Sequence, residues 1–387
     1  MTFIPCKDSL KFIEENRHLS LDRILYLAAK KKLNGIFIAN QIKGLKKIED
    51  KVPSWRDFPL IYPTTVSIEQ CSSEKTAIYK SSLIKGESIA DLTGGFGVDI
   101  YFLNKSFKKS IYCELNSELF EIVNYNFEKL SCNIETHKKN GIEFIQELTG
   151  NLDCIYIDPS RRNEKKERVY QLEDYSPNII KYSDLLLNKA STLLIKTSPF
   201  LEPKDVISKL KYIKEIHVVS VKNDCKEVLY LLNKGHKGAI KIHAIDLEAE
   251  KKFTFEYENE LKKCELNNPL KYLYEPNSAI LKAGAYESVG MHYKLHKLNR
   301  NSHLYTSEKP IEDFPGRQFL IIATTNYNSK EVSKYVSEKK ANISKRNFPY
   351  STDEIRKKLK LKDGGDTYLF ATTLKNNKIA IVICRKY

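Results

Sequence analysis

The sequence predicts an α/β protein whose central part is a doubly wound sheet, preceded by a helical region and followed by α+β segments. From residue 89 onward, short apolar runs alternate with amphipathic stretches, as strands alternating with helices do. The last two apolar runs, EIHVVSV and EVLYLL, are separated only by KNDCK, which is too short for a parallel crossover. We therefore expect an antiparallel hairpin at the end of this sheet. A chain of 387 residues suits two or three domains.

The elements follow in order along the chain. Residues 8–32 carry Leu and Ile at helical spacing, and the prolines of KVPSWRDFP end that pattern, which predicts a helical N-terminal region over residues 1–62. Five strands are expected in SIADLT, SIYCEL, LDCIYIDP, STLLIKTS and IHVVSV. After residue 235 the helices become sparse, and AIKIHAI, KKFTFEYE and NSAILKAGAYESVG predict a small α+β segment.

The C-terminal part has its own predicted order. It consists of strand QFLIIATT, helix SKEVSKYVSEKKA, strand NISKRNF, helix STDEIRKKLKL, and strands TYLFATTL and KIAIVICRK. Asn376 and Asn377 join the last two strands. Ser351 followed by Glu354 predicts a capping box at the second helix.

Composition excludes several classes of protein. The longest apolar run, in KIAIVIC, is far shorter than the roughly 18 residues that a membrane span needs, so we expect a cytoplasmic protein. The eight cysteines form no CxxC pair and have no histidine nearby at ligand spacing. That scatter suits reduced thiols and predicts neither a disulfide frame nor a metal site.

The formal charge of +15 favours a polyanionic partner such as a nucleic acid. The alternative is a composition bias, because the chain has 53 Lys beside many Asn, Ile and Tyr, as an AT-rich genome produces. The distribution is more informative. Residues 328–362 contain eleven Lys or Arg and four acids, a net charge of +7.

A glycine turn follows the first strand, in DLTGGFG. A strand ending in Asp91, then glycines, then a helix places backbone amides beside a ligand. The order differs from GxGxxG, the pattern of nicotinamide dinucleotide sites, which remain the alternative. Glu114, 23 residues after Asp91, ends the next strand, where a carboxylate can accept both hydroxyls of a ribose. Asn140, in HKKNGIEFI before the expected third strand, is placed at an adenine edge, and Asp158 ends the fourth strand.

This series resembles the class I S-adenosylmethionine (SAM) dependent methyltransferases, and more specifically a bacterial family of them with a C-terminal THUMP-like domain. The segments that carry the resemblance are SIEQCSSEKTAIYK, DLTGGFGVD, IDPSRRN, IKTSPF, NDCKEVLYLL, EPNSAILKAGAY, NSHLYTS, DFPGRQF and RKKLKLKDGGDTYLFATT. The resemblance implies a Rossmann-like methyltransferase domain over 63–235, a ferredoxin-like segment over 236–316 and a THUMP-like domain over 317–387. It also implies SAM as cofactor, and RNA, mostly tRNA but also rRNA, as partner. Its cofactor site would comprise Asp91, Thr93, Gly94, Gly95, Gly97, Glu114, Asn140 and Asp158.

The methyl acceptor is predicted from the residues around Asp158. Amine methyltransferases usually carry a second proline and then an aromatic after this residue, whereas DPSRR has Ser160 and Arg161. Uridine carbon-5 enzymes need a cysteine nucleophile after the next strand, where LLIKTSPF has none; Cys225 is the nearest substitute and is expected to be a bystander.

Ribose 2′-O-methyltransferases of the heat-shock type use Lys, Asp, Lys and Glu, and this chain offers Lys80, Asp158, Lys196 and Glu227 in that order. A lysine near two carboxylates and a sulfonium can accept or orient a hydroxyl proton. The alternatives are that Lys80 lies on a solvated helix face, that a base is methylated, that a protein or small molecule is the acceptor, or that the chain binds SAM and RNA without turnover.

RNA-binding residues are predicted on two segments. Arg161 and Arg162 suit a phosphate, because the guanidinium fork matches its oxygens, although salt bridges to Glu164 or Glu167 are the alternative. In the basic C-terminal segment we expect RNA contacts from Lys345, Arg346, Arg356, Lys357 and Lys358.

Overall fold

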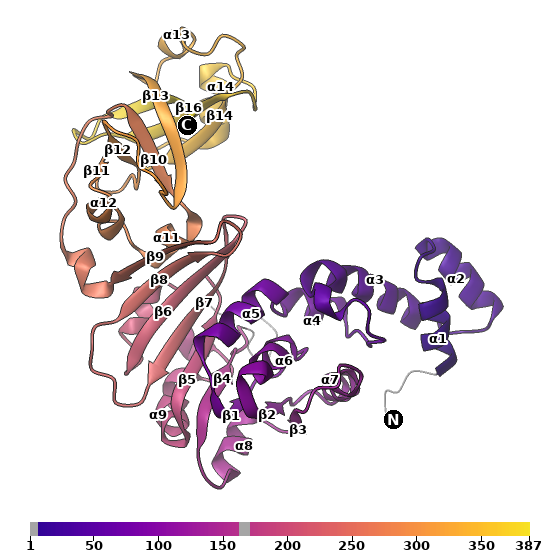
Figure 1. Ribbon diagram of the computed structural model, residues 1–387. Coiled ribbons are helices and arrows are strands. Elements are labelled where there is room, and N and C mark those ends of the chain that lie inside the picture. Colours follow the sequence, from indigo (N-terminus) through magenta and orange to yellow (C-terminus); the bar gives the residue numbers. More distant parts are fainter. Residues whose placement is uncertain (1–6, 162–170) are drawn as a thin grey trace. The chain divides into compact units, whose positions relative to one another are not determined.

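The computed structural model describes residues 7–161 and 171–387 (Figure 1). The chain forms two compact units. The first contains the chain up to Leu201 together with Asp205–Ile213 and Leu229–Lys237. The second contains Glu202–Lys204, Lys214–Val228 and Gly238–Tyr387. Each unit is described by itself.

The N-terminal helices form where the periodicity predicts them. They are α1 (Lys7–Asn16), α2 (Leu21–Lys30) and α3 (Gly35–Lys51). Ser20 and Asn34 cap α2 and α3 by accepting hydrogen bonds from backbone amides. A small apolar core holds the three helices together, consisting of Phe12, Ile24, Ala28, Ile38 and Ile42. The helix α3 ends before the first proline, and buried Trp55 then packs edge-on against Phe96 and Tyr101 of the methyltransferase-like part.

A nine-stranded sheet has the order β3-β2-β1-β4-β5-β7-β6-β8-β9. Its parallel part comprises β1 (Gly86–Asp91), β2 (Phe107–Cys113), β3 (Glu135–His137), β4 (Leu152–Ile157) and β5 (Ala190–Thr197). The helices of this region are α4 (Thr65–Gln70), α5 (Glu74–Leu83), α6 (Val98–Leu103), α7 (Ser117–Lys129), α8 (Gly141–Glu147), α9 (Ile179–Lys189) and α10 (Pro203–Ile207). The strand order reverses between β1 and β4, and ligands of such sheets bind outside the carboxyl ends of the strands at that point. One expectation was wrong, because HKKNGIEFI follows β3 instead of preceding it.

The predicted terminal hairpin is present. Strands β6 (Ile213–Val221) and β7 (Asp224–Asn233) are neighbours joined only by Lys222 and Asn223. Both linking residues have left-handed φ, 53° and 57°, as a two-residue hairpin requires.

Two further strands extend this sheet. Strand β8 (Lys241–Asp246) pairs in parallel with β6, and β9 (Lys251–Glu256) pairs antiparallel with β8. Their sequences were expected in the ferredoxin-like segment from residue 236 onward. The sequence predicted both strands, but strand propensity does not reveal which sheet a strand joins. The domain boundary at residue 236 stays a prediction.

A seven-stranded sheet follows, with the order β11-β12-β10-β13-β16-β15-β14. Its strands are β10 (Tyr272–Pro276), β11 (His296–Lys297), β12 (Tyr305–Ser307), β13 (Gly316–Thr325), β14 (Asn342–Arg346), β15 (Thr367–Thr373) and β16 (Ile379–Lys386). The accompanying helices are α11 (Ser278–Ala283), α12 (Ser288–His292), α13 (Ser329–Val332) and α14 (Thr352–Leu359). Earlier in the chain, short 3₁₀ helices occur at η1 (Pro53–Trp55), η2 (Asn104–Ser106), η3 (Leu172–Asp174) and η4 (Tyr257–Leu261).

Two C-terminal predictions have different outcomes. The capping box at Ser351 and Glu354 is confirmed at the start of α14. The helix expected over 329–341 was wrong in length, since α13 ends at Val332. Between Ser329 and Lys340 only Val332 and Val336 are buried apolar residues, which is too narrow a stripe to hold a longer helix against the sheet.

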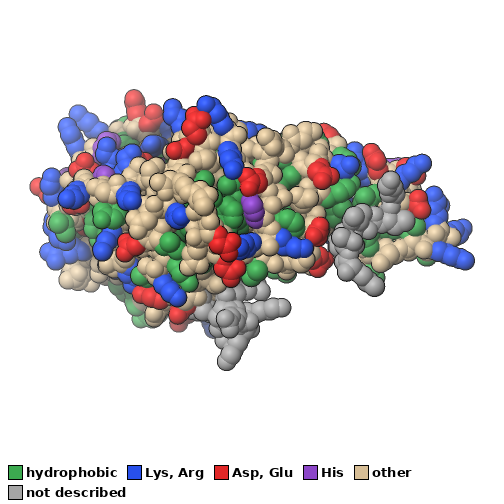
Figure 2. Space-filling model, turned by 90° about the horizontal axis from the view of Figure 1, so that it is seen from below, with side chains coloured by type: hydrophobic (Ala, Val, Ile, Leu, Met, Phe, Trp, Pro, Cys, Tyr) green, Lys and Arg blue, Asp and Glu red, His purple; other side chains and the backbone are tan. Residues whose placement is uncertain are grey.

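The surface carries both signs of charge. On the face drawn in Figure 2, Lys and Arg side chains are interspersed with Asp and Glu, so the net positive charge is not gathered there into one patch. Among the described residues, none of the helices is long and apolar enough to cross a bilayer.

Candidate active site at the glycine turn

The glycine turn directly follows β1 and needs its glycines. Gly95 and Gly97 adopt φ of +54° and +76°, which side chains rarely adopt, and Gly97 begins α6. At Gly94 a Cβ atom would lie 2.1 Å from the ring of Tyr112. The Tyr112 hydroxyl donates a hydrogen bond to the carbonyl of Gly95, at 2.7 Å. The turn is thus fastened to β2 and presents bare backbone on its other side.

Two acidic residues hold the turn from either end. The Oδ1 atom of buried Asp91 accepts hydrogen bonds from the amide and hydroxyl of Thr93, at 2.9 and 3.3 Å. Glu114, just beyond β2, accepts from the amides of Gly95 at 3.0 Å and Asn116 at 2.6 Å. Burial raises the pKa of Glu114, although these amides oppose the shift. Each carboxylate oxygen of Glu114 accepts one of these bonds and so keeps a lone pair for a ligand hydroxyl.

Asn140 caps α8 and also lines a pocket. Its Oδ1 atom accepts a hydrogen bond from the amide of Ile142 at 2.8 Å. At the adjacent Gly141, a Cβ atom would lie 2.2 Å from the carbonyl oxygen of Leu92, so α8 starts in contact with the residue after β1. The pocket beside Asn140 is also lined by Tyr175 and Tyr182. Asn140 therefore both caps α8 and lines this pocket, and its contact with adenine stays a prediction.

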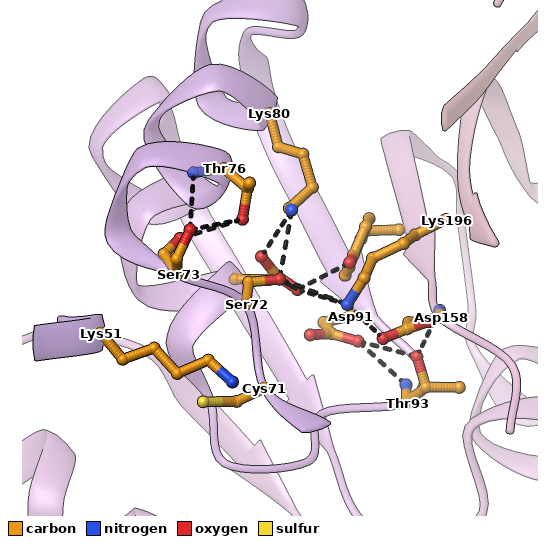
Figure 3. A network of polar contacts seen from close by, with 12 residues as sticks. Lys51, Cys71, Ser72, Ser73, Thr76, Lys80, Asp91, Thr93, Asp158 and Lys196 are labelled. Atoms are coloured by element: carbon orange, nitrogen blue, oxygen red, sulfur yellow. Dashed lines mark hydrogen bonds and ion pairs between the residues drawn. The ribbon is translucent and has the colours of Figure 1, made fainter. Parts of the chain in front are cut away.

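A lysine–aspartate cluster, defined as Lys80, Asp99, Asp158 and Lys196, lies next to the turn (Figure 3). Lys196 in β5 is 2.6 Å from Oδ2 of Asp158, which follows β4, and 3.6 Å from Oδ2 of Asp99 in α6. Lys80 in α5 is 3.2 Å from Oδ1 of Asp99. The cluster joins the turn where the amide of Asp158 donates to the Thr93 hydroxyl at 2.7 Å.

Ser72 connects the two lysines. Both ammonium groups of the cluster donate to its Oγ atom at 3.2 Å, and this hydroxyl donates to Oδ2 of Asp99 at 2.8 Å. The hydroxyl of Tyr156 donates to the same oxygen of Asp99 at 2.8 Å. The network fixes Lys80, Lys196 and Asp99 by more than one contact each, which a buried charge requires.

The two carboxylates of the cluster balance its two ammonium groups, and Asp91 interacts with both of these carboxylates. Burial alone would raise the pKa of Asp99, but Lys80, Lys196 and two hydroxyl donors hold it at about 2. Burial raises the pKa of Asp91, and Asp99 and Asp158 add to that rise while Thr93 opposes it. Asp91 therefore adds a net negative charge only when it is ionised, and its raised pKa opposes that ionisation. A cationic ligand beside Asp91 would favour the ionised form.

The depressed pKa of Asp99 predicts a loss of stability in acid. The carboxyl is protonated below about 3.8 in the unfolded chain but only near 2 in the folded one, so its contribution is present above 3.8 and is lost as the pH falls toward 2. Between pH 6 and pH 3 the parent should lose about 1 kcal/mol more unfolding free energy than Asp99→Asn, as measured by urea unfolding. Equal losses in both proteins would contradict the ion-pair network.

The structure brings together three residues of the predicted tetrad. Lys80 and Lys196 belong to the cluster with Asp158, while Glu227 is a buried residue of β7 in the second unit, so its place beside them stays a prediction. Lys80 is fully buried, which overturns the alternative of a solvated helix face. Burial raises the pKa of Cys225 to about 12, which agrees with a bystander thiol.

Three members of the network were missed: Ser72, Asp99 and Tyr156. Asp99 carried a signal, because an acid in the first turn after the glycines lies beside the site. The sequence contained no indication of a site role for Ser72 or Tyr156, because a serine in a loop and a tyrosine in an apolar strand are common in any protein.

The predicted RNA-binding arginines differ in their surroundings. Arg161 lies 5.2 Å from the ring centroid of Phe200, whose side chain is 69% exposed. Arg162, Glu164 and Glu167 lie outside the described residues. Arg346 pairs with buried Glu275 at 2.9 Å, beside Arg317, and Arg356 pairs with Asp363 at 2.6 Å.

The three predicted lysines of the C-terminal segment are exposed, namely Lys345, Lys357 and Lys358. Lys358 lies 4.1 Å from the ring centroid of Tyr327 and 5.9 Å from that of Tyr350. These lysines therefore remain able to contact a polyanion, whereas the two arginines are engaged with carboxylates.

Comparison with known proteins identifies the family. Residues 272–315 match a family described as a ferredoxin-like domain, and residues 316–386 match one described as THUMP domain-like. The chain is 32% identical to a candidate methyltransferase from Porphyromonas gingivalis of known crystal structure, covers 99% of both chains, and superposes with a TM-score of 0.87. No functionally curated protein matches the chain.

Other solved structures resemble part of the chain. TrmK of M. capricolum, in complex with S-adenosyl-homocysteine, is 21% identical over 43% of this chain and 69% of its own, with a TM-score of 0.32. A candidate RNA methyltransferase from Pyrococcus horikoshii is 14% identical over 48% of this chain and 98% of its own, with a TM-score of 0.34.

The sheet order and the relative of known crystal structure define a methyltransferase with a doubly wound sheet. The chain belongs to the family of the P. gingivalis protein, and its own C-terminal part matches the ferredoxin-like and THUMP-like families.

Proposed function

We propose that the protein transfers the methyl group of SAM to RNA, either tRNA or rRNA, and that the acceptor is a ribose 2′-hydroxyl. The observation that carries this proposal is the contact of 2.6 Å between Lys196 Nζ and Asp158 Oδ2, at the carboxyl ends of two adjacent parallel strands and beside the glycine turn. A hydroxyl nucleophile needs help with its proton, which a paired lysine and carboxylate can give.

The cofactor site follows from the geometry of the turn. The residues proposed to hold SAM are Asp91, Thr93, Gly94, Gly95, Gly97, Glu114, Asn140 and Asp158. The bare backbone of Gly95 would meet the ligand, and Glu114 would accept hydrogen bonds from the ribose hydroxyls. A sulfonium cation beside Asp91 would favour the ionised form of this carboxylate and would be attracted to it.

In the proposed reaction SAM supplies a methyl group on a sulfur that departs as a neutral thioether. Lys196 Nζ orients the acceptor hydroxyl by donating a hydrogen bond to its oxygen. Oδ2 of Asp158, which is more exposed than Lys196, receives the hydroxyl proton as the new carbon–oxygen bond forms. Lys80, being fully buried, acts as a positioning residue through Asp99 and Ser72.

The test is identification of the methylated atom. Purified protein is given SAM carrying a labelled methyl group and RNA from a strain lacking the gene, and the RNA is digested to nucleosides for mass spectrometry. We expect a 2′-O-methyl nucleoside, and an otherwise identical RNA with a 2′-deoxy target should accept no methyl group. Full transfer to the deoxy RNA would contradict ribose methylation.

A base is the second candidate acceptor, and one observation favours it. Phe200 follows β5 and is exposed, with the guanidinium of Arg161 over its ring. An exposed aromatic beside an arginine offers a surface on which a base can stack. A methylated base among the digested nucleosides, together with weaker transfer by Phe200→Ala, would support this candidate.

The C-terminal segment is the proposed RNA-docking surface. Its support is the net charge of +7 over 328–362 and the exposed lysines Lys345, Lys357 and Lys358, the last of which lies over Tyr327. Tyr350, 41% exposed, adds an aromatic face beside them. Basic groups beside aromatic rings suit single-stranded RNA.

Replacing Lys345, Lys357 and Lys358 together with Gln should weaken RNA binding and flatten its salt dependence. Removing one lysine–phosphate interaction lowers the log–log salt slope by about 0.7 to 0.9, so we expect a change of about 2. Gln at Arg346 and Arg356 should change the slope less, because these arginines pair with acids. The matched control is Gln at the exposed Lys30, Lys31 and Lys32. An unchanged slope in the C-terminal variant would assign this charge to genome composition.

A further inference from the structure

Three potential metal ligands meet on one face of β6 and β8, in the second unit. Glu215 and His217 are two residues apart in β6, so their side chains point to the same face of the sheet. His243 in β8 is the direct parallel partner of His217 in the register. Their potential ligand atoms all lie within 4.8 Å of one another.

The distances fit a tetrahedral metal site. Nε2 of His217 is 3.3 Å and Nε2 of His243 is 3.6 Å from the same carboxylate oxygen, Oε2 of Glu215. Zinc binds histidine nitrogen and carboxylate oxygen at about 2.0–2.1 Å, which in a tetrahedron separates neighbouring ligand atoms by about 3.3 Å. The two imidazole rings stack with centroids 4.6 Å apart, so both present the same edge to Glu215.

Neighbouring groups orient two of the three ligands. Nδ1 of His243 contacts the hydroxyl of Thr254 in β9 at 2.8 Å, which leaves Nε2 facing the cluster. Oε1 of Glu215 is 3.2 Å from the ammonium of Lys214, which leaves Oε2 for the histidines. Ligating histidines usually have such a partner on their other nitrogen, and it fixes the ring for the metal.

Burial and neighbouring charges shift the pKa values of all three groups. Burial lowers the pKa of His243 to about 4, and the nearby His217, Lys252 and Lys241 add to the shift while Glu215 opposes it. Burial also lowers the pKa of His217. The hydrogen bond with His217 lowers the pKa of Glu215 to about 2.

We propose that Glu215, His217 and His243 bind a divalent transition-metal ion of the zinc type, with a fourth position open to water. The histidines are nearly buried and Glu215 is 22% exposed, so the open position faces the Glu215 side. The ion would join β6 to β8 and so stabilise the extension of the sheet. This site is separate from the residues proposed for methyl transfer.

The sequence did not predict this site. The two histidines are 26 residues apart, outside any local ligand spacing, and only the parallel pairing of β6 with β8 brings them together. The expectation of no metal rested on local spacing alone.

The test uses the full-length protein without a histidine tag, stripped with a chelator and titrated with Co²⁺ and then Zn²⁺. We expect one Co²⁺ per chain with the visible absorption of tetrahedral cobalt, displacement by Zn²⁺, and a rise in Tm with Zn²⁺. Glu215→Gln and His243→Asn should lose binding, and Thr254→Val should weaken it by about 10- to 100-fold. His18→Asn, at an exposed histidine, is the matched control.

Three results would overturn the proposal. The parent protein could fail to bind either ion while remaining folded by circular dichroism. Glu215→Gln and His243→Asn could bind as tightly as the parent. A near-ultraviolet thiolate band on cobalt binding would assign the ion to cysteines. In the first case the cluster is a histidine–carboxylate hydrogen bond on the sheet and nothing more.

Discussion

Replacing Lys196 with Met lowers the rate of methyl transfer in a single turnover by about 10² to 10⁴, the usual contribution of a positioned acid–base group. Lys196 Nζ is 2.6 Å from Oδ2 of Asp158, and Met has similar length but neither charge nor donor. We expect RNA affinity and SAM binding to be nearly unchanged. The measurement is rapid-quench transfer of a labelled methyl group with enzyme in excess over RNA.

Two controls accompany this variant. Lys211→Met, at an exposed lysine, should transfer at the parental rate. Lys196→Arg keeps the charge but changes the donor geometry, and it should remain slow. Because Lys196 also neutralises Asp99, a thermal melt must show Lys196→Met to be folded. Parental rates in a folded Lys196→Met protein would remove Lys196 from the reaction.

Weakened SAM binding is the second large effect, expected for Gly95→Val and Glu114→Ala. Valine is β-branched and is strained at the φ of +54° that Gly95 adopts. Glu114→Ala removes the carboxylate that would accept the ribose hydroxyls, and hydrogen bonds to charged groups contribute about 1.5 to 3 kcal/mol. Each variant should lose about 10- to 100-fold in affinity by isothermal titration calorimetry.

The same experiment includes Asp91→Ala, which removes the acceptor for the Thr93 amide and should also weaken binding. Glu118→Ala, at an exposed acid in α7, is the matched control and should bind like the parent. If Gly95→Val, Glu114→Ala and Asp91→Ala all bind SAM with parental affinity, the proposed cofactor site is wrong.

The parts of the site that are local in sequence could be predicted. A glycine turn after a strand, with acids at successive strand ends, leaves a pattern that chain order alone reveals, and Asp91, Glu114 and Asp158 lie at those ends. The terminal hairpin followed from the short link between β6 and β7. The fold class was predictable for the same reason, because alternating strands and helices admit few arrangements.

The parts that depend on packing between distant segments could not be predicted. Lys80 is 19 residues before Asp99 in the chain, and its complete burial follows from how α5 packs beside α6. Ser72 is 124 residues from Lys196, yet it bridges the two lysines. The pairing of β8 with β6, which joins His243 to His217, likewise depends on the register of strands far apart in sequence.

Whether this protein methylates RNA is tested by locating the labelled methyl group after transfer from SAM. Purified protein is incubated with SAM carrying a labelled methyl group and total RNA from a strain that lacks the gene, beside Lys196→Met and RNA from the parent strain. The account predicts label in RNA that ribonuclease releases, little label with Lys196→Met, and little with RNA already modified in the parent strain. No label in RNA from the deletion strain, with label instead in protein or a small molecule, would contradict it.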